Sequence, residues 1–106
     1  MPAGDAKVEL DLNSQRFQAN LFVLDRDTQR AVMETLRKIS SLTWPEVYRD
    51  SGLKWEKISR VTPPAGVSAT YSLRLTRARR ATACRDGNIM RLLTIPPDHD
   101  ATYGRK

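Results

Sequence analysis

The chain has little of the side-chain chemistry on which several large enzyme classes depend. Its 106 residues include one cysteine, Cys84, and one histidine, His99. One cysteine excludes an internal disulfide, and the two residues together are too few for a zinc site built from cysteine and histidine. Glycine-rich nucleotide-binding patterns and the GxSxG nucleophile pattern are also absent. We therefore expect no cofactor and no metal, and Cys84, in a run of small residues, is predicted to be a packed thiol.

Long hydrophobic runs are absent as well. No apolar stretch approaches the roughly 20 residues that a membrane-spanning helix needs. The first twelve residues lack the basic and then apolar pattern of a signal peptide. Together with the single cysteine, which suits a reducing compartment, this predicts a cytoplasmic protein with no membrane partner. The length predicts one domain over residues 1–106, with flexible ends at 1–6 and 104–106.

Positive charge is concentrated in the second half of the chain. Residues 1–53 contain seven Lys or Arg and eight Asp or Glu, whereas residues 54–106 contain eleven and four. The net charge of the whole chain is +6. A basic half on a small domain predicts a polyanionic partner, which is RNA, DNA or an acidic protein. The alternative is a soluble basic surface without a specific partner.

Hydrophobic spacing predicts the helices. Apolar residues at helical intervals indicate one helix over residues 14–24 and a second over 28–42, with Asp27 as its cap. A short third helix over 44–52 begins with capping-box spacing and a proline. Its expected buried side chains are Trp44, Val47 and Tyr48.

Alternation of apolar and polar residues predicts the strands, at residues 8–12, 54–61, 69–75, 80–85 and 89–95. Asp86-Gly87-Asn88 predicts a tight turn between the last two strands. The element order therefore predicts an α+β fold, in which an N-terminal strand and two to three helices pack on one face of a mainly antiparallel four- to five-stranded sheet.

Basic residues of the later strands must then point to the sheet face that the helices leave open. Arg74 lies on the polar face of its strand, and Arg80 opens the next strand six residues later. If the two strands pair, the two guanidinium groups lie close together and repel, so an anion such as a phosphate is their natural partner. Further basic residues are predicted to widen this RNA-binding patch: Lys54, Lys57, Arg60, Arg77 and Arg79.

The C-terminal segment supplies candidate acid–base groups. His99 lies between two aspartates, and Tyr103 follows four residues later. If these side chains converge with the arginines, the set matches metal-free RNA cleavage, in which the 2′-hydroxyl attacks the adjacent phosphorus. Glu56 or His99 is then the candidate base, and His99 or Tyr103 the candidate acid. The alternative is a loop histidine and a tyrosine that packs the tail against the sheet.

The element order and the stretch YSLRLTRARRA, residues 71–81, resemble the RelE/ParE superfamily of bacterial toxin–antitoxin toxins. That family has an aromatic-led strand with basic residues, a short connection and an arginine that opens the next strand. It ends with a polar segment that carries His or Arg followed by Tyr, here residues 95–103. The resemblance covers residues 7–103 in element order and residues 71–103 in motif, and it implies a compact helical pair on a curved antiparallel sheet.

The resemblance also implies a function. A RelE-like relative is an endonuclease of mRNA in the ribosomal A site, neutralised by an acidic antitoxin whose complex binds operator DNA. By position, Arg74 would be a phosphate-binding cation, Arg80 the transition-state arginine, and His99 and Tyr103 the acid–base pair. Ser72 departs from the family, because RelE-like nucleases often carry a basic residue there. ParE-like relatives inhibit DNA gyrase instead, so a gyrase inhibitor or a non-catalytic basic binding module is the alternative function.

Overall fold

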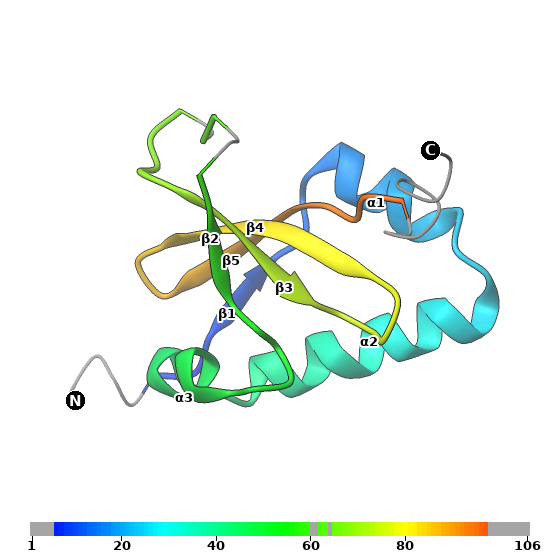
Figure 1. The fold of residues 1–106 in the computed structure, drawn as a ribbon, viewed down its shortest axis with the longest axis horizontal. Helices are drawn as coiled ribbons and strands as arrows, with labels where there is room; N and C mark the ends of the chain where they lie inside the picture. The colour runs from blue at the N-terminus through cyan, green and yellow to red at the C-terminus, as the bar shows by residue number, and fades with distance from the viewer. Residues whose placement is uncertain (1–5, 60–61, 64, 98–106) are drawn as a thin grey trace.

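The computed structural model describes residues 6–59, 62–63 and 65–97. These residues form three helices and five strands (Figure 1), which confirms the predicted α+β class. In chain order the elements are β1 (Glu9–Asp11), α1 (Gln15–Phe22), α2 (Arg26–Ser40), α3 (Trp44–Arg49), β2 (Glu56–Ile58), β3 (Thr70–Arg74), β4 (Arg80–Asp86) and β5 (Ile89–Thr94). Of the ends expected to be flexible, residues 1–5 and 104–106 lie outside the described residues.

The strands form one mixed sheet in the order β1-β5-β4-β3-β2. The pairs β2–β3, β3–β4 and β4–β5 are antiparallel, and β1 runs parallel to β5. The predicted tight turn connects β4 to β5, with Gly87 at φ +61, a backbone conformation that glycine adopts without steric cost. Among the described strands β2 pairs with β3 alone, so it is an edge strand of three residues.

Local signals in the sequence position α1 and α2. Ser14 Oγ accepts a hydrogen bond from the Phe17 N–H and so caps α1. The prediction that Asp27 caps the second helix is wrong, because α2 begins two residues earlier, with Asp25 at the cap position and Asp27 inside the first turn. Both aspartates suit a helix N-terminus, where negative charge is favourable. The register of α2 is instead set by burial of Val32, Leu36 and Ile39.

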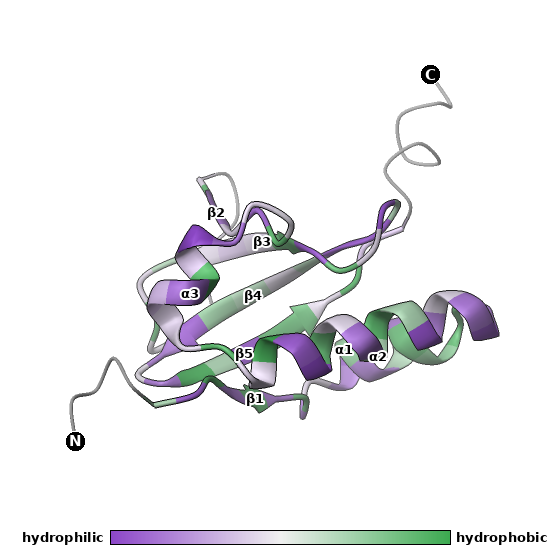
Figure 2. Ribbon diagram, turned by 90° about the horizontal axis from the view of Figure 1, so that it is seen from below, coloured by the Kyte–Doolittle hydropathy of each residue, from purple (hydrophilic) through white to green (hydrophobic). Residues whose placement is uncertain are grey.

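The core lies between the helices and one face of the sheet. Figure 2 shows α1 and α2 along the same side of the sheet. Alternate strand residues point toward them and are fully buried: Leu73, Ala81, Ala83, Met90 and Leu92. Residues between these positions point to the other face. We call the part of that face formed by Glu56, Ser72, Arg74, Arg80, Thr82 and Thr94 the open face.

An irregularity in β5 decides which residues reach the open face. Thr82 pairs with Thr94, whereas the next residue, Ala83, pairs with Leu92, so the register shifts by one residue at Leu93. Without this bulge Thr94 would share the face of Leu92 and point into the core. Ser14 Oγ donates a 2.9 Å hydrogen bond to the Leu93 carbonyl. The cap of α1 thereby anchors the bulge.

The third helix joins the sheet through aromatic rings. The predicted capping box is present, with Thr43 and Glu46 as its two members. Trp44 is buried, and its ring lies 5.1 Å from that of Trp55. The prediction that Tyr48 is buried is wrong, because 53% of it is exposed. Among the described helices none is long and apolar enough to cross a membrane.

Candidate active site

Arg74 and Arg80 face each other across neighbouring strands. They are paired residues in the register of β3 and β4, at the end nearest the connecting hairpin. Directly opposite residues share a face and bring their Cβ atoms to within about 5 Å of each other. Since Leu73 and Ala81 point into the core, both arginines point to the open face. The structure therefore places the two arginines opposite each other on one face of the sheet.

Glu56 lies beside this pair on the edge strand. It pairs with Ser72 in the register of β2 and β3, which places it on the open face. Arg80 Nη2 donates a 2.9 Å hydrogen bond to Ser72 Oγ and lies 3.6 Å from Glu56 Oε1. The Arg80 side chain is 34% exposed and that of Glu56 is 64% exposed. An ion pair this loose and this accessible contributes little to stability, so both groups remain available to a ligand.

The arrangement has the chemistry of a phosphate site with a base beside it. Two guanidinium groups supply planar forks of donors that match phosphate oxygens. A carboxylate a few ångströms away can accept a proton from a hydroxyl bound next to the phosphate. Because the guanidinium of Arg80 is held by Ser72, it is positioned before any ligand arrives. Such preorganised charge is what stabilises a developing anion.

The other predicted RNA-binding residues are less tightly grouped. Lys54, at φ +50 just before β2, is exposed. Lys57 pairs with Tyr71, whose ring stacks on Trp55, so it leaves the sheet on the helix side. Lys57 therefore lies on the opposite face of the sheet from Arg74 and Arg80, and its role in binding RNA stays a prediction. The cause is strand alternation, because Glu56 and Lys57 are neighbours and must point to opposite faces.

The hairpin arginines and the tail complete the predicted set. Arg77 is exposed in the β3–β4 hairpin, and Arg79 is half-buried beside Ile95 and Pro97. His99, Tyr103 and Arg60 lie outside the described residues. The roles of all these residues stay predictions.

Two solved structures resemble this fold. The structure of the YoeB dimer from Staphylococcus aureus is 13% identical in sequence, with 89% of this chain and 100% of that chain covered and a TM-score of 0.53. The chain therefore shares its fold with this protein. A copper-bound mutant toxin from Helicobacter pylori is 17% identical, with 91% of this chain and 99% of that chain covered and a TM-score of 0.50. No protein-family model and no curated protein matches the sequence.

Sequence reasoning missed two groups of this candidate site. Ser72 was noted for lacking the family's basic residue and not as the hydrogen-bond partner of Arg80. The hydroxyls of Thr82 and Thr94 lie 2.6 Å apart on the open face. Thr82 follows Arg80 by two residues in β4, so the two side chains are neighbours on the same face. The two-residue turn at Gly87 predicts the register near the turn. The bulge at Leu93, which brings Thr94 to this face, has no comparable signal.

Cys84 follows Thr82 by two residues in β4, on the same face of the sheet but outside the set of residues that we call the open face. It is fully buried, in agreement with the packed thiol predicted from its small neighbours. Burial raises the pKa of the Cys84 thiol, and the nearby positive charge of Arg91 opposes this rise without cancelling it. The thiol therefore stays protonated at neutral pH, which is unsuited to nucleophilic attack. Within the described residues no group of three or more His, Cys, Asp or Glu is placed to hold a metal ion.

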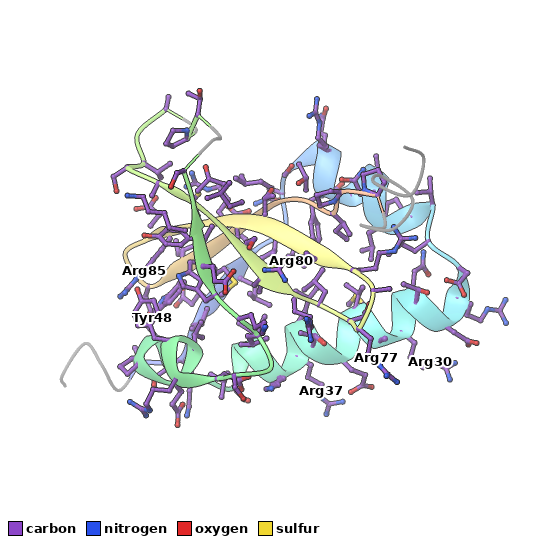
Figure 3. All side chains as sticks on the ribbon, viewed as in Figure 1. Arg30, Arg37, Tyr48, Arg77, Arg80 and Arg85 are labelled. Carbon is purple, nitrogen blue, oxygen red and sulfur yellow. The ribbon has the colours of Figure 1, made fainter. Side chains whose placement is uncertain are left out.

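Arg85 packs on two aromatic rings at the far end of β4, on the helix side of the sheet. Arg85 Nη1 donates a 2.6 Å hydrogen bond to Tyr48 Oη, and its guanidinium lies 4.5 Å from the centre of the Trp44 ring. Figure 3 shows Arg85 and Tyr48 together near α3, well apart from Arg80. Stacking of a cation on an aromatic face stabilises by about 0.5–1 kcal/mol at an exposed site. This contact explains why Tyr48 stays near the surface.

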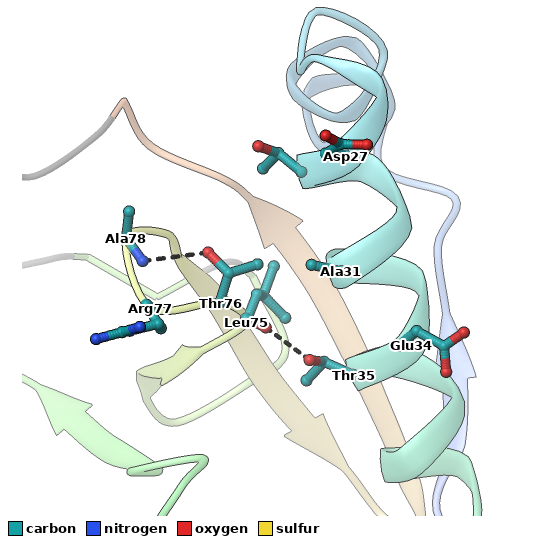
Figure 4. Close-up of a pocket in the computed structure, with 9 residues that line it drawn as sticks. Asp27, Ala31, Glu34, Thr35, Leu75, Thr76, Arg77 and Ala78 are labelled. Carbon is teal, nitrogen blue, oxygen red and sulfur yellow. Dashed lines mark hydrogen bonds between the residues drawn. The ribbon is translucent and has the colours of Figure 1, made fainter.

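An open groove of about 650 Å³ separates α2 from the β3–β4 hairpin (Figure 4). Its floor includes Ala31 and Leu75, and Thr35 Oγ1 crosses it with a 2.6 Å hydrogen bond to the Leu75 carbonyl. Its rim carries charges of both signs, from Glu34 on the helix and Arg77 on the hairpin. Leu75 points to the helix side of the sheet, so the groove and the Arg80 cluster lie on different faces.

Proposed function

We propose that the chain is the toxin of a toxin–antitoxin pair and that it cleaves ribosome-bound mRNA in the A site without a metal ion. One observation carries this proposal. Arg74 and Arg80 are cross-strand partners on the sheet face opposite the described helices, with Glu56 beside Arg80. The RelE-like fold and the surplus of basic residues in the second half support the same function.

The reaction is an attack within the RNA itself. The 2′-hydroxyl oxygen forms a bond to the adjacent phosphorus, and its proton passes to a base. The bond between phosphorus and the 5′-oxygen breaks, and an acid protonates that oxygen as it leaves. The products are a 2′,3′-cyclic phosphate and a 5′-hydroxyl, so no oxidant, reductant or second substrate is required.

The residues divide this work between charge and proton transfer. Arg74 and Arg80 hold the phosphate and stabilise the extra negative charge that builds on its oxygens. Glu56 is the candidate base within the described residues, since its carboxylate lies 3.6 Å from the Arg80 guanidinium. His99 and Tyr103 remain the candidate acids, with His99 also an alternative base.

The partner that neutralises this activity is proposed to be an acidic antitoxin. A net charge of +6 favours association with a chain of opposite sign. Binding of operator DNA would then be a property of the complex with the antitoxin. A short acidic reading frame next to the gene, with a DNA-binding pattern, is the expected source of that partner.

Primer extension on mRNA translated by purified ribosomes tests the nuclease. The wild-type chain is expected to produce cuts within codons, and Arg80→Ala to lower the cleavage rate by about 100- to 1,000-fold, the usual effect of losing one transition-state donor. Arg37→Ala, which removes an exposed arginine of α2, is the matched control. Circular dichroism and the Tm of each variant establish that folding is unchanged.

The outcomes separate the proposed activity from its alternatives. Full cleavage by the Arg80→Ala and His99→Ala double variant would overturn the site assignment. Absence of cleavage in every condition would overturn the enzyme. Inhibition of gyrase supercoiling that survives loss of His99 and Tyr103 would identify a ParE-like inhibitor instead, and normal growth during induced expression would exclude a toxin of either kind.

A further inference from the structure

A pair of threonine hydroxyls extends the open face beyond the arginines. The side-chain oxygens of Thr82 and Thr94 lie 2.6 Å apart, and both residues are half-buried. In one row across four strands the open face carries Glu56, Ser72, Thr82 and Thr94. Adjacent strands are about 4.8 Å apart, so the row spans roughly 14 Å.

The bulge in β5 is what creates this pair. Met90 and Leu92 point into the core, and strict alternation would send Thr94 there as well. The extra residue at Leu93 turns Thr94 to the open face instead, opposite Thr82. Bulges are enriched next to active sites, where they redirect a side chain. The bulge is held by the α1 cap, and it places the Thr94 hydroxyl near Arg80, where it can contact the same ligand.

The hydrogen-bonding capacity of the pair matches a neutral sugar hydroxyl. Two hydroxyls that share one hydrogen bond keep one free O–H donor and several free lone pairs. A phosphate offers acceptors alone and is matched by the guanidinium groups of Arg74 and Arg80. A ribose 2′-hydroxyl both donates and accepts, and it is the group by which proteins distinguish RNA from DNA.

We infer that Thr82 and Thr94 form a ribose subsite, which binds the sugar of a nucleotide next to the phosphate held by Arg74 and Arg80. The strand of RNA then runs across the sheet, from β3 and β4 toward β5. Among the described residues the open face carries two arginines against one carboxylate, Glu56, and this positive balance favours a polyanion such as RNA as its occupant. The inference rests on the proposed function, and it adds the contact by which the site prefers RNA.

Binding of two short probes to the free protein tests the subsite without requiring cleavage. The probes are a single-stranded RNA hexamer and the DNA hexamer of the same base sequence, titrated at low salt. The wild-type chain is expected to bind the RNA hexamer more tightly than the DNA hexamer. The Thr82→Val and Thr94→Val double variant should weaken RNA binding by about threefold to tenfold, the effect of one or two hydrogen bonds, and leave DNA binding unchanged.

Valine keeps the shape of threonine and suits a strand, so the variant should fold. Thr28→Val, on α2 and away from the open face, is the matched control. Equal RNA and DNA affinity in the wild type, or an unchanged ratio in the double variant, would overturn the ribose subsite. Loss of binding of both probes in Arg80→Ala, together with an unchanged ratio in the double variant, would leave the phosphate site standing and remove the subsite alone. Binding of both probes by Arg80→Ala at wild-type affinity would count against the proposed function itself.

Backbone amide shifts in an NMR titration give a second readout. The RNA hexamer is expected to shift the signals of Thr82 and Thr94 more than that of Thr28. Shifts confined to the α2 side of the molecule would overturn the proposal, because they would place the RNA contact on the helix side of the sheet.

Discussion

Arg74 and Arg80 are cross-strand partners, so two positive charges stand directly opposite each other on the same face of the sheet. Like charges at such positions destabilise a sheet by roughly 0.2–1 kcal/mol. Glu56 approaches Arg80 at 3.6 Å and relieves this repulsion in part. Binding of an anion between the two guanidinium groups would remove the remaining repulsion.

Removal of one arginine should therefore stabilise the protein while it weakens the site. Arg74→Gln is expected to raise the free energy of unfolding by about 0.5 kcal/mol and to lower affinity for the RNA hexamer. Urea denaturation at low salt measures the first effect. Added salt should reduce the difference, since it screens exposed charges. Arg77→Gln, which has no arginine opposite it, is the control. An Arg74→Gln variant that is less stable than the wild type would contradict the explanation.

Thr70 offers a second way to stabilise the fold. Its side chain is 1% exposed, and Thr70 Oγ1 has no hydrogen-bond partner among the described residues. A buried hydroxyl without a partner costs about 1–3 kcal/mol. Thr70→Val should thus raise the Tm and increase the free energy of unfolding by about 1 kcal/mol. Thr28→Val, at a half-buried surface position, should change it little; a lower Tm for Thr70→Val would mean that the hydroxyl is satisfied after all.

Cys84 should make the fold sensitive to alkaline pH. Burial raises the pKa of its thiol above the ordinary value, so the folded state holds this proton more tightly than the unfolded state. The corresponding stability is complete below the unfolded pKa of about 8.5 and is lost as the pH rises through the folded pKa. Denaturation of wild type and Cys84→Ala between pH 7 and 10 isolates this contribution. Alkylation by iodoacetamide should be slow in buffer and fast in urea; rapid labelling of the native protein would refute the buried thiol.

Asp50 should make the fold sensitive to acid. Its carboxylate accepts a hydrogen bond from Lys38 and others from the Gly52 and Leu53 N–H groups, and these hold its pKa below the ordinary value. The stability that they contribute is present above the unfolded pKa of about 3.9 and is lost as the pH falls through the folded pKa. Asp50→Asn should cost about 1–2 kcal/mol at pH 7. Its stability should approach that of wild type near pH 2, and an equal gap at both pH values would contradict the assignment.

The sequence predicts what depends on local periodicity and connection length. Alternation places Arg74 on a polar face. The short connection to Arg80 favours antiparallel pairing of the two strands, in the register that sets these residues opposite each other. The same reasoning yields the turn at Gly87 and the capping box at Thr43. Each of these features is determined by residues close together in the chain.

What the sequence does not predict depends on contacts between distant segments. Tyr48 has helical spacing typical of a buried residue, but Arg85 from another element binds it at the surface. The bulge that exposes Thr94 is held by Ser14, 79 residues from its partner Leu93. Glu56 and Lys57 must fall on opposite faces, but which of them reaches the open face depends on the register of β2 against β3, and the imperfect alternation around them leaves that register undetermined.

The position of β2 at the edge of the sheet affects how firmly Glu56 is held. Glu56 is carried by three residues that are joined to the sheet on one side, through β3. Fraying of this short ladder separates the carboxylate from Arg80 while the core beneath stays intact. Conversely, a chain that paired with the edge of β2 that no described strand occupies would hold the Glu56 carboxylate in place without touching the arginines. Glu56 thus lies on a short edge strand, whereas Arg74 and Arg80 lie on strands that are paired on both sides.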